Sequence, residues 1–172
     1  QALRRLPSLL EEVNEFGKAQ VDVSPYDDVS FPLGIAVRSD PVKAYVTITE
    51  GCNDFCAFCV VPYTRGHERM RPAREILDEV RQAVDQGHRE IHLLGQIVNH
   101  YRAPDTPGCD FAGLLERINE IPAVQRIRFA SPHPRHVTSR LIAALRDLPR
   151  VCKHLHLPVQ SGSTPILESM RR

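Results

Sequence analysis

The sequence lacks any long apolar run. No uninterrupted stretch approaches the roughly 18 residues that a membrane-spanning helix needs, and the first residues lack the order of a secretion signal. We therefore expect a cytoplasmic protein with no membrane partner. Lysine is scarce as well, since only three of the 22 basic residues are Lys. An arginine-rich set suits phosphate or carboxylate partners, although a GC-rich genome produces the same bias.

An excess of charge of one sign is also missing. The formal net charge is +1 at pH 7, which excludes a protein that binds nucleic acid by overall charge alone. Any contact with RNA must therefore come from a local basic patch. The run 64–74 (TRGHERMRPAR) is one candidate, because it holds four Arg and one acidic residue. A solvated entrance to a helix is the alternative interpretation of this run.

The five cysteines do not suit a disulfide framework. Their number is odd, and three of them, Cys52, Cys56 and Cys59, lie within eight residues. Three thiolates in a C-x3-C-x2-C run can reach three corners of a 4Fe-4S cluster and leave the fourth iron open to an external ligand. A structural zinc site is the alternative, although it would more usually show paired C-x2-4-C elements or supporting His. Cys109 and Cys152 lie far along the chain, and we expect neither to be a ligand.

The hydrophobic pattern alternates between strands and helices from residue 41 onward. Strands are expected at 44–49, 90–94, 126–130 and 154–157, and each is followed by an amphipathic helix. Four such units in succession predict an α/β fold with parallel strands and outer helices, a partial (β/α) barrel of the TIM type. Loops that leave the C-terminal ends of such strands converge on one face. The cysteine loop and three further polar loops lie at these ends, so we expect the functional site there.

The first forty residues follow a different pattern. Apolar residues at helical spacing between Leu6 and Val13 predict a helix, whereas residues 17–42 carry the scattered Pro, Gly and acidic residues of a linker. The sequence starts and ends within predicted helices and does not begin with Met. We therefore expect it to be a fragment of a longer protein.

Four separated motifs carry a resemblance to one enzyme family. They are the C-x3-C-x2-C loop with Phe58 before its last Cys, and the stretches 93–101 (LLGQIVNHY), 131–134 (SPHP) and 154–163 (HLHLPVQSGS). In order and spacing they resemble the methylthiotransferases of the radical S-adenosylmethionine (SAM) superfamily, most closely the MiaB-type branch. That branch adds a methylthio group to C2 of N6-isopentenyladenosine beside the tRNA anticodon.

Three alternatives to this function stay open. A related methylthiotransferase would act on threonylcarbamoyladenosine in tRNA, or on an aspartate of a ribosomal protein. A metal-binding RNA module without catalysis is the alternative from another class. Ile97 stands where the family ordinarily has Asn, and Met70 stands where Ser is usual. The first change removes an amide that could hydrogen-bond SAM or substrate.

The resemblance implies the cofactors and the partners. Cys52, Cys56 and Cys59 would hold a 4Fe-4S cluster, whose open iron is chelated by the amine and carboxylate of SAM. In the family this cluster cleaves SAM to a 5′-deoxyadenosyl radical, while a second 4Fe-4S cluster in an N-terminal domain carries the sulfur. The implied partners are the tRNA anticodon stem-loop and an electron donor such as flavodoxin or ferredoxin. We expect a monomer.

The resemblance also divides the chain into regions. Residues 1–18 would be the tail of the N-terminal methylthiotransferase domain, residues 19–40 a linker, and residues 41–172 an incomplete radical SAM core. The family's C-terminal RNA-binding barrel is absent from this sequence. We therefore expect the second cluster and the barrel only in the full-length protein.

The resemblance assigns no catalytic residue beyond the cluster ligands. Phe58 is expected beside the adenine of SAM, with a core position beneath the loop as the alternative. The other expected SAM contacts lie at strand ends and are Gln96, Asn99, Gln160, Ser161 and Gly162. The amides of the first two can instead cap loops. Candidates for substrate contact are Arg65, Arg69, Arg71 and His133.

Overall fold

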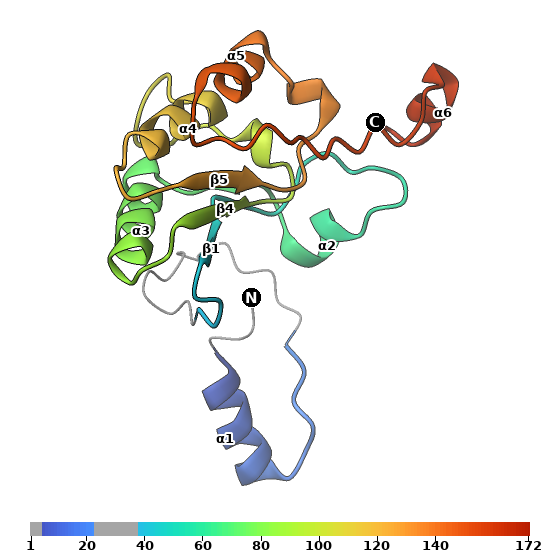
Figure 1. Cartoon of the computed structure of the whole chain (residues 1–172). Coiled ribbons are helices and arrows are strands. Elements are labelled where there is room, and N and C mark those ends of the chain that lie inside the picture. Colours follow the sequence, from blue (N-terminus) through green and yellow to red (C-terminus); the bar gives the residue numbers. More distant parts are fainter. Residues whose placement is uncertain (1–4, 23–37) are drawn as a thin grey trace. The chain divides into compact units, whose positions relative to one another are not determined.

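The structure is a computed structural model that describes residues 5–22 and 38–172 (Figure 1). The chain divides into two compact units, Gln1–Phe31 and Pro32–Arg172. The first unit contains helix α1 (Leu6–Phe16), which ends at Gly17 with a left-handed φ of 61°. This confirms the helix that was predicted from the apolar residues between Leu6 and Val13. The expected linker 19–40 is described only at residues 19–22 and 38–40, and its other residues lie outside the described part.

A parallel sheet lies at the centre of the second unit. Its strands are β1 (Lys43–Thr47), β4 (Glu90–Leu94) and β5 (Arg126–Phe129), in the order β1-β4-β5. Ala44 is in register with Ile91, which is in register with Ile127, and all three side chains are fully buried. The expected α/β fold with a parallel sheet is therefore confirmed. No closed barrel is formed by the residues that the structure describes.

Helices pack on this sheet through apolar faces. Helix α3 (Ala73–Asp85) contacts β1 and buries Ile76, Val80 and Ala83, whose spacing places them on one side of the helix. Helix α4 (Phe111–Asn119) contacts β5, and α5 (Ser139–Asp147) packs on α4. Among the described residues, no helix has both the length and the apolar character to cross a bilayer.

Side-chain caps fix where these helices begin. Asp110 accepts a hydrogen bond from the backbone N–H of Gly113 at 2.9 Å, as its N-cap position requires. Thr138 caps α5 in the same way. The cap of α3 comes from a distant part of the chain, because the Asp105 carboxylate accepts from the backbone N–H groups of Ala73 and Arg74 at 2.7 and 3.0 Å. The helix starts expected at residues 110 and 138 are thus confirmed.

The expected fourth strand, His154–Leu157, is wrong. The chain meets β5 only at one parallel bridge between Val151 and Ile127, and it has no strand structure at 154–157. The alternating His and Leu residues satisfy the period of a strand, but a strand also needs a continuous ladder of backbone hydrogen bonds. Here the ladder consists of two bonds, in which Ile127 donates to Arg150 and Cys152 donates to Ile127.

The sequence pattern also missed a small antiparallel pair. Strands β2 (Thr49–Glu50) and β3 (Arg69–Met70) flank the cysteine loop, and Thr49 is separated from β1 by Ile48. Two short helices complete the second unit: α2 (Val61–Arg65) follows the cysteines, and α6 (Thr164–Ser169) follows Ser163. Ser163 occupies the expected N-cap position of α6, although its side chain makes no capping hydrogen bond.

Candidate functional site

The cysteine loop is closed at both ends by backbone contacts. Gly51 has a φ of 73°, and a Cβ atom at this position would lie 2.1 Å from the carbonyl oxygen of His67. Only glycine fits there without displacing backbone atoms. The N–H of Cys52 then donates to the carbonyl of Gly66 at 3.2 Å. The loop therefore leaves β2 and returns to β3 in a shape that its glycine and backbone determine.

The three clustered cysteines line one cavity of about 380 Å³. Its wall takes residues from all four of the polar loops that follow the expected strands. The other lining residues that matter for the site are Asp54, Phe58, Gln96, Ile97, His133, Gln160 and Arg172. In Figure 1 the arrow of β5 points toward the side on which α2 and the cysteine loop lie. The expected convergence of the loops on one face is therefore confirmed.

All three thiols in this cavity are free. Cys52 is buried, and its Sγ accepts from the N–H of Asp54 at 3.4 Å. Burial raises the pKa of the Cys52 thiol above its usual range, so a metal must displace a proton to bind there. Among the described residues, no three Cys, His, Asp or Glu side chains are gathered at the spacing of a metal ion.

Three buried polar atoms of the cavity wall lack a hydrogen-bond partner within the described part of the chain. They are Oδ2 of Asp54, Oε1 of Gln96 and Nε2 of His133. Buried polar groups in folded proteins are nearly always paired, so unpaired ones beside a cavity indicate a polar ligand. Three thiols and three unsatisfied polar atoms in one cavity fit an iron-sulfur cluster with a polar organic ligand at its open iron.

His133 is held as a neutral hydrogen-bond donor. Its Nδ1 accepts from the N–H of Arg135 at 3.1 Å, which places the proton of the neutral ring on Nε2. The side chain is almost fully buried, and its Nε2 lies 3.9 Å from Oδ2 of Asp54. Burial and the nearby charge of Arg172 lower the pKa of His133 to about 4. Near pH 7 the ring therefore presents an N–H group to the cavity.

The expected SAM contacts divide into two groups. Phe58 and Gln160 line the cavity together with Gln96, and the Phe58 ring is 59% exposed, so the alternative of a core phenylalanine is wrong. Asn99, Ser161 and Gly162 are not among the lining residues. The Ser161 hydroxyl accepts from the N–H of Ser163 at 3.1 Å instead.

Asn99 is occupied by a neighbouring loop. It is 3% exposed, and its Nδ2 donates to the carbonyl of His133 at 2.9 Å. Its Oδ1 accepts from the N–H of the same residue at 2.8 Å. Asn99 therefore caps a loop, as the alternative interpretation expected. The buried Oε1 of Gln96, in contrast, has no hydrogen-bond partner among the described residues.

The expected basic contacts also differ in their placement. Arg65 is exposed at the end of α2, and Arg69 lies 3.7 Å from the carboxylate of Glu50. Arg71 is 2% exposed and donates to the carboxylate of Glu79 at 2.5 Å and to the carbonyl of Thr47 at 3.2 Å. A guanidinium buried between β1 and α3 cannot meet a substrate phosphate, and the expectation for Arg71 is corrected accordingly.

Several lining residues were not expected from the sequence. Asp54 lies inside the cysteine motif itself, which is the signal that could have identified it. Arg172 reaches the site from the far end of the chain and donates to the carbonyl of Pro158 at 3.1 Å, a contact that no local pattern indicates. Ile97 is 7% exposed and contributes apolar surface to the wall.

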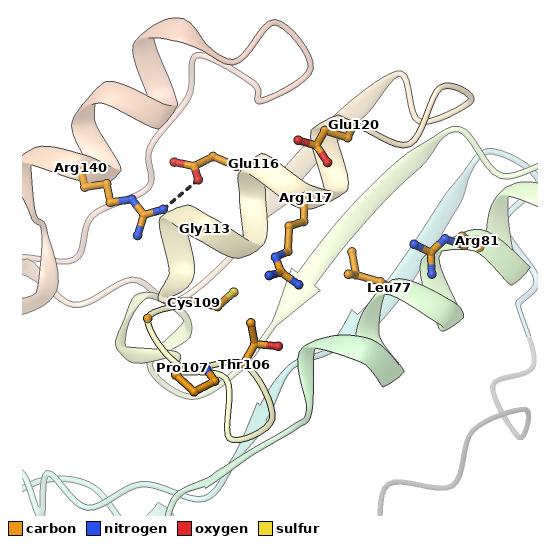
Figure 2. Close-up of a pocket in the computed structure, with 11 residues that line it drawn as sticks. Leu77, Arg81, Thr106, Pro107, Cys109, Gly113, Glu116, Arg117, Glu120 and Arg140 are labelled. Atoms are coloured by element: carbon orange, nitrogen blue, oxygen red, sulfur yellow. Dashed lines mark hydrogen bonds and ion pairs between the residues drawn. The ribbon is translucent and has the colours of Figure 1, made fainter.

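A second cavity, of about 590 Å³, lies among α3, α4 and the start of α5 (Figure 2). Its charged lining residues are Arg81, Glu116, Arg117, Glu120 and Arg140. Arg140 donates to Glu116 at 2.8 Å, and burial raises the pKa of the Cys109 thiol at the cavity wall. None of the unpaired buried side-chain atoms found in the described residues belongs to this cavity. The larger cavity therefore lacks the feature that indicates a ligand at the cysteines.

Comparison with known proteins gives a consistent result. The family model described as the radical SAM superfamily matches residues 46–172. A tRNA-2-methylthio-N(6)-dimethylallyladenosine synthase of Neisseria meningitidis serogroup A is 45% identical over 174 residues, covering 100% of this chain and 39% of the relative. The protein of the same name from Paraburkholderia phytofirmans is 46% identical over 176 residues, covering 100% of this chain and 38% of the relative. The chain thus spans about two fifths of the length of these curated relatives.

Proposed function

We propose, because this chain belongs to the radical SAM superfamily, that it is the radical-generating core of a tRNA methylthiotransferase. The full-length protein would add a methylthio group to C2 of N6-isopentenyladenosine beside the anticodon. One observation carries this proposal: a single cavity collects three free cysteines and three unpaired buried polar atoms. The substrate assignment is supported by 45% identity across the chain to synthases whose name states that product.

Cys52, Cys56 and Cys59 would hold the 4Fe-4S cluster that enzymes of this superfamily use together with SAM. When bound, the cluster supplies the electron that cleaves the sulfonium of SAM to a 5′-deoxyadenosyl radical. The protein's part is to place SAM and to exclude water from the radical. Ile97 and Val61 contribute apolar surface to the cavity, which suits that second task.

The polar wall offers groups of both kinds to SAM. The Nε2–H of His133 is a donor, and Oε1 of Gln96 and Oδ2 of Asp54 are acceptors. A methionyl group with an ammonium and a carboxylate, attached to a ribose, can satisfy all three. Phe58 presents an exposed ring that can pack against the adenine, and Gln160 lines the cavity together with Pro158 and His156.

The RNA contacts and the flanking regions complete the proposal. Arg65 and Arg69 follow the cysteine loop and would contact phosphates of the tRNA anticodon stem-loop. Residues 1–18 would belong to an N-terminal domain that carries a second 4Fe-4S cluster, residues 19–40 to a linker, and residues 41–172 to the core. A C-terminal RNA-binding barrel, a flavodoxin or ferredoxin as electron donor, a monomeric state and a cytoplasmic location belong to the same proposal.

The test uses the full-length protein, purified and loaded with iron and sulfide without oxygen. Given SAM, a reductant and an isopentenylated anticodon stem-loop, it should form 5′-deoxyadenosine and the methylthio product, measured by chromatography and mass spectrometry. Cys56→Ala should abolish both products. Cys152→Ala is the matched control and should retain them, because Cys152 does not line the cavity.

Two outcomes would contradict the proposal. Turnover of a threonylcarbamoylated stem-loop in place of the isopentenylated one would reassign the substrate. Tight binding of zinc by the wild-type protein, with no cleavage of SAM, would favour a metal-binding module without catalysis.

A further inference from the structure

Three hydrogen bonds join two loops at the site, and two of them are made by the side chain of Asn99. Asn99 lies in the short 3-10 turn Val98–His100 after β4, and its amide makes both of its hydrogen bonds to the backbone of His133. The N–H of Val98 also donates to the carbonyl of Ser131, at 3.3 Å. These three bonds fix the turn 131–136, which follows β5, against the turn Val98–His100.

The same turn contacts the cysteine loop through one carboxylate. Arg135 donates to Oδ1 of Asp54 at 3.4 Å, and the Nε2 of His133 faces Oδ2 of Asp54 at 3.9 Å. The backbone N–H of Asp54 in turn donates to Sγ of Cys52 at 3.4 Å. A continuous set of contacts therefore runs from Asn99 to a cysteine that would bind iron.

The cysteine loop depends on such outside contacts for its shape. It has no helix or strand between Cys52 and Cys59, and Phe55 has a φ of 21°, which L-residues rarely adopt. Backbone bonds hold it at Cys52, which donates to Gly66, and at Ala57, which donates to Met170. The side chain of Asn53 also accepts from the N–H of Glu68 at 3.1 Å. Asp54 lies between Cys52 and Ala57, so its carboxylate is where the turn 131–136 can hold the middle of the loop.

We propose that Asn99 is a positioning residue for the cluster-binding loop, acting through His133, Arg135 and Asp54. The role rests on the cluster-binding part of the proposed function and gives Asn99 a task other than contact with SAM. Without this amide, the turn 131–136 loses two of the three bonds that fix it to the turn Val98–His100. Asp54 would then be held by a mobile partner, and the spacing between Cys52 and Cys56 would vary.

The test follows the cluster itself in the full-length, iron-loaded protein. Asn99→Ala should increase the rate at which a chelator bleaches the visible absorption of the cluster by about tenfold, the lower end of what the loss of outer-shell support costs in metal affinity. It should also weaken the change that SAM produces in the electron paramagnetic resonance spectrum of the reduced cluster. Neither measurement involves tRNA or methylthiolation.

Asn119→Ala is the matched control. Asn119 also uses its side chain on a backbone N–H, that of Arg150 at 3.1 Å, but it lies at the end of α4 and does not line the cysteine cavity. Asn119→Ala should lower the melting temperature as Asn99→Ala does and leave the bleaching rate within about twofold of the wild-type rate. Equal bleaching of both variants, or no change in Asn99→Ala, would overturn the proposal.

A second variant covers the case in which Asn99→Ala does not fold. Asp54→Asn changes one partly exposed carboxylate, and it should accelerate bleaching in the same direction. Where both variants fold, the double variant should bleach no faster than the faster single one, because the two residues act along one set of contacts. Additive effects, or a wild-type rate in Asp54→Asn, would count against the role of Asn99. A wild-type protein that binds no iron would overturn the proposed function before any variant is compared.

Discussion

Replacing Glu79 by Gln tests whether the buried charges beside β1 stabilise the fold. The carboxylate of Glu79 accepts from Arg38 at 2.6 Å and from Arg71 at 2.5 Å, and the side chains of all three residues are less than a tenth exposed. The substitution keeps the shape of the side chain and removes its charge. Both buried guanidinium groups would then lose the anion between them, while Arg71 would keep the more exposed carboxylate of Glu75 at 3.6 Å.

The expected loss follows from that burial. Removing one partner of a buried ion pair costs about 3–5 kcal/mol of unfolding free energy, because the remaining charge stays desolvated. The neighbouring residue Asp78 supplies a matched control, since its pair with Arg81 at 2.8 Å has both side chains more than half exposed. Asp78→Asn should cost less than about 1 kcal/mol.

Urea unfolding followed by circular dichroism measures both changes. The loss in Glu79→Gln should persist in high salt, because buried pairs are screened little. A loss below about 1 kcal/mol, or one equal to that of Asp78→Asn, would refute the reasoning.

Two further predictions concern the site. Gly51→Ala should prevent iron binding, measured as iron per protein, because the added Cβ would collide with the carbonyl of His67. Gly87→Ala is the control, since Gly87 has a φ of 99° and no atom within 4 Å of the added carbon. This variant should bind iron normally at a cost of about 1 kcal/mol in stability. The pKa of His133, lowered from 6.5 to about 4, means that the unfolded chain binds a proton there before the folded one does as the pH falls. The melting temperature should therefore fall as the pH is lowered from 6.5 to about 4. This dependence of melting temperature on pH should be weaker in His133→Gln. An unchanged dependence would show that the pKa of His133 is not lowered in the folded protein.

Local patterns in the sequence were sufficient for the elements that bury an apolar face. The strand at 90–94 and the helix starts at Asp110 and Thr138 were predicted at their observed positions. The meeting of the first three loops at one cavity also followed from the sequence, because the parallel strands β1, β4 and β5 bring their C-terminal ends to one edge. The fourth loop reaches the same cavity without a strand before it.

What the sequence could not indicate depends on partners far along the chain. His154–Leu157 has the alternation of a strand but no ladder to join. Arg71 lies in a basic run that looks exposed, and only its distance to Glu79, on the next helix, shows that it is buried. Asn99 has the side chain of a ligand contact, yet its two bonds go to a backbone 34 residues away.

The start of α3 can be capped only after a later part of the chain, Asp105, has been synthesised. The first turn of this helix depends on a carboxylate at Asp105, which is 32 and 31 residues beyond the N–H groups of Ala73 and Arg74 that it accepts from. Closing a loop of that length costs entropy before the contact forms. A nascent chain that ends before Asp105 would therefore carry α3 with a frayed start, and this helix would be fully capped only after β4 and the loop to Asp105 have emerged.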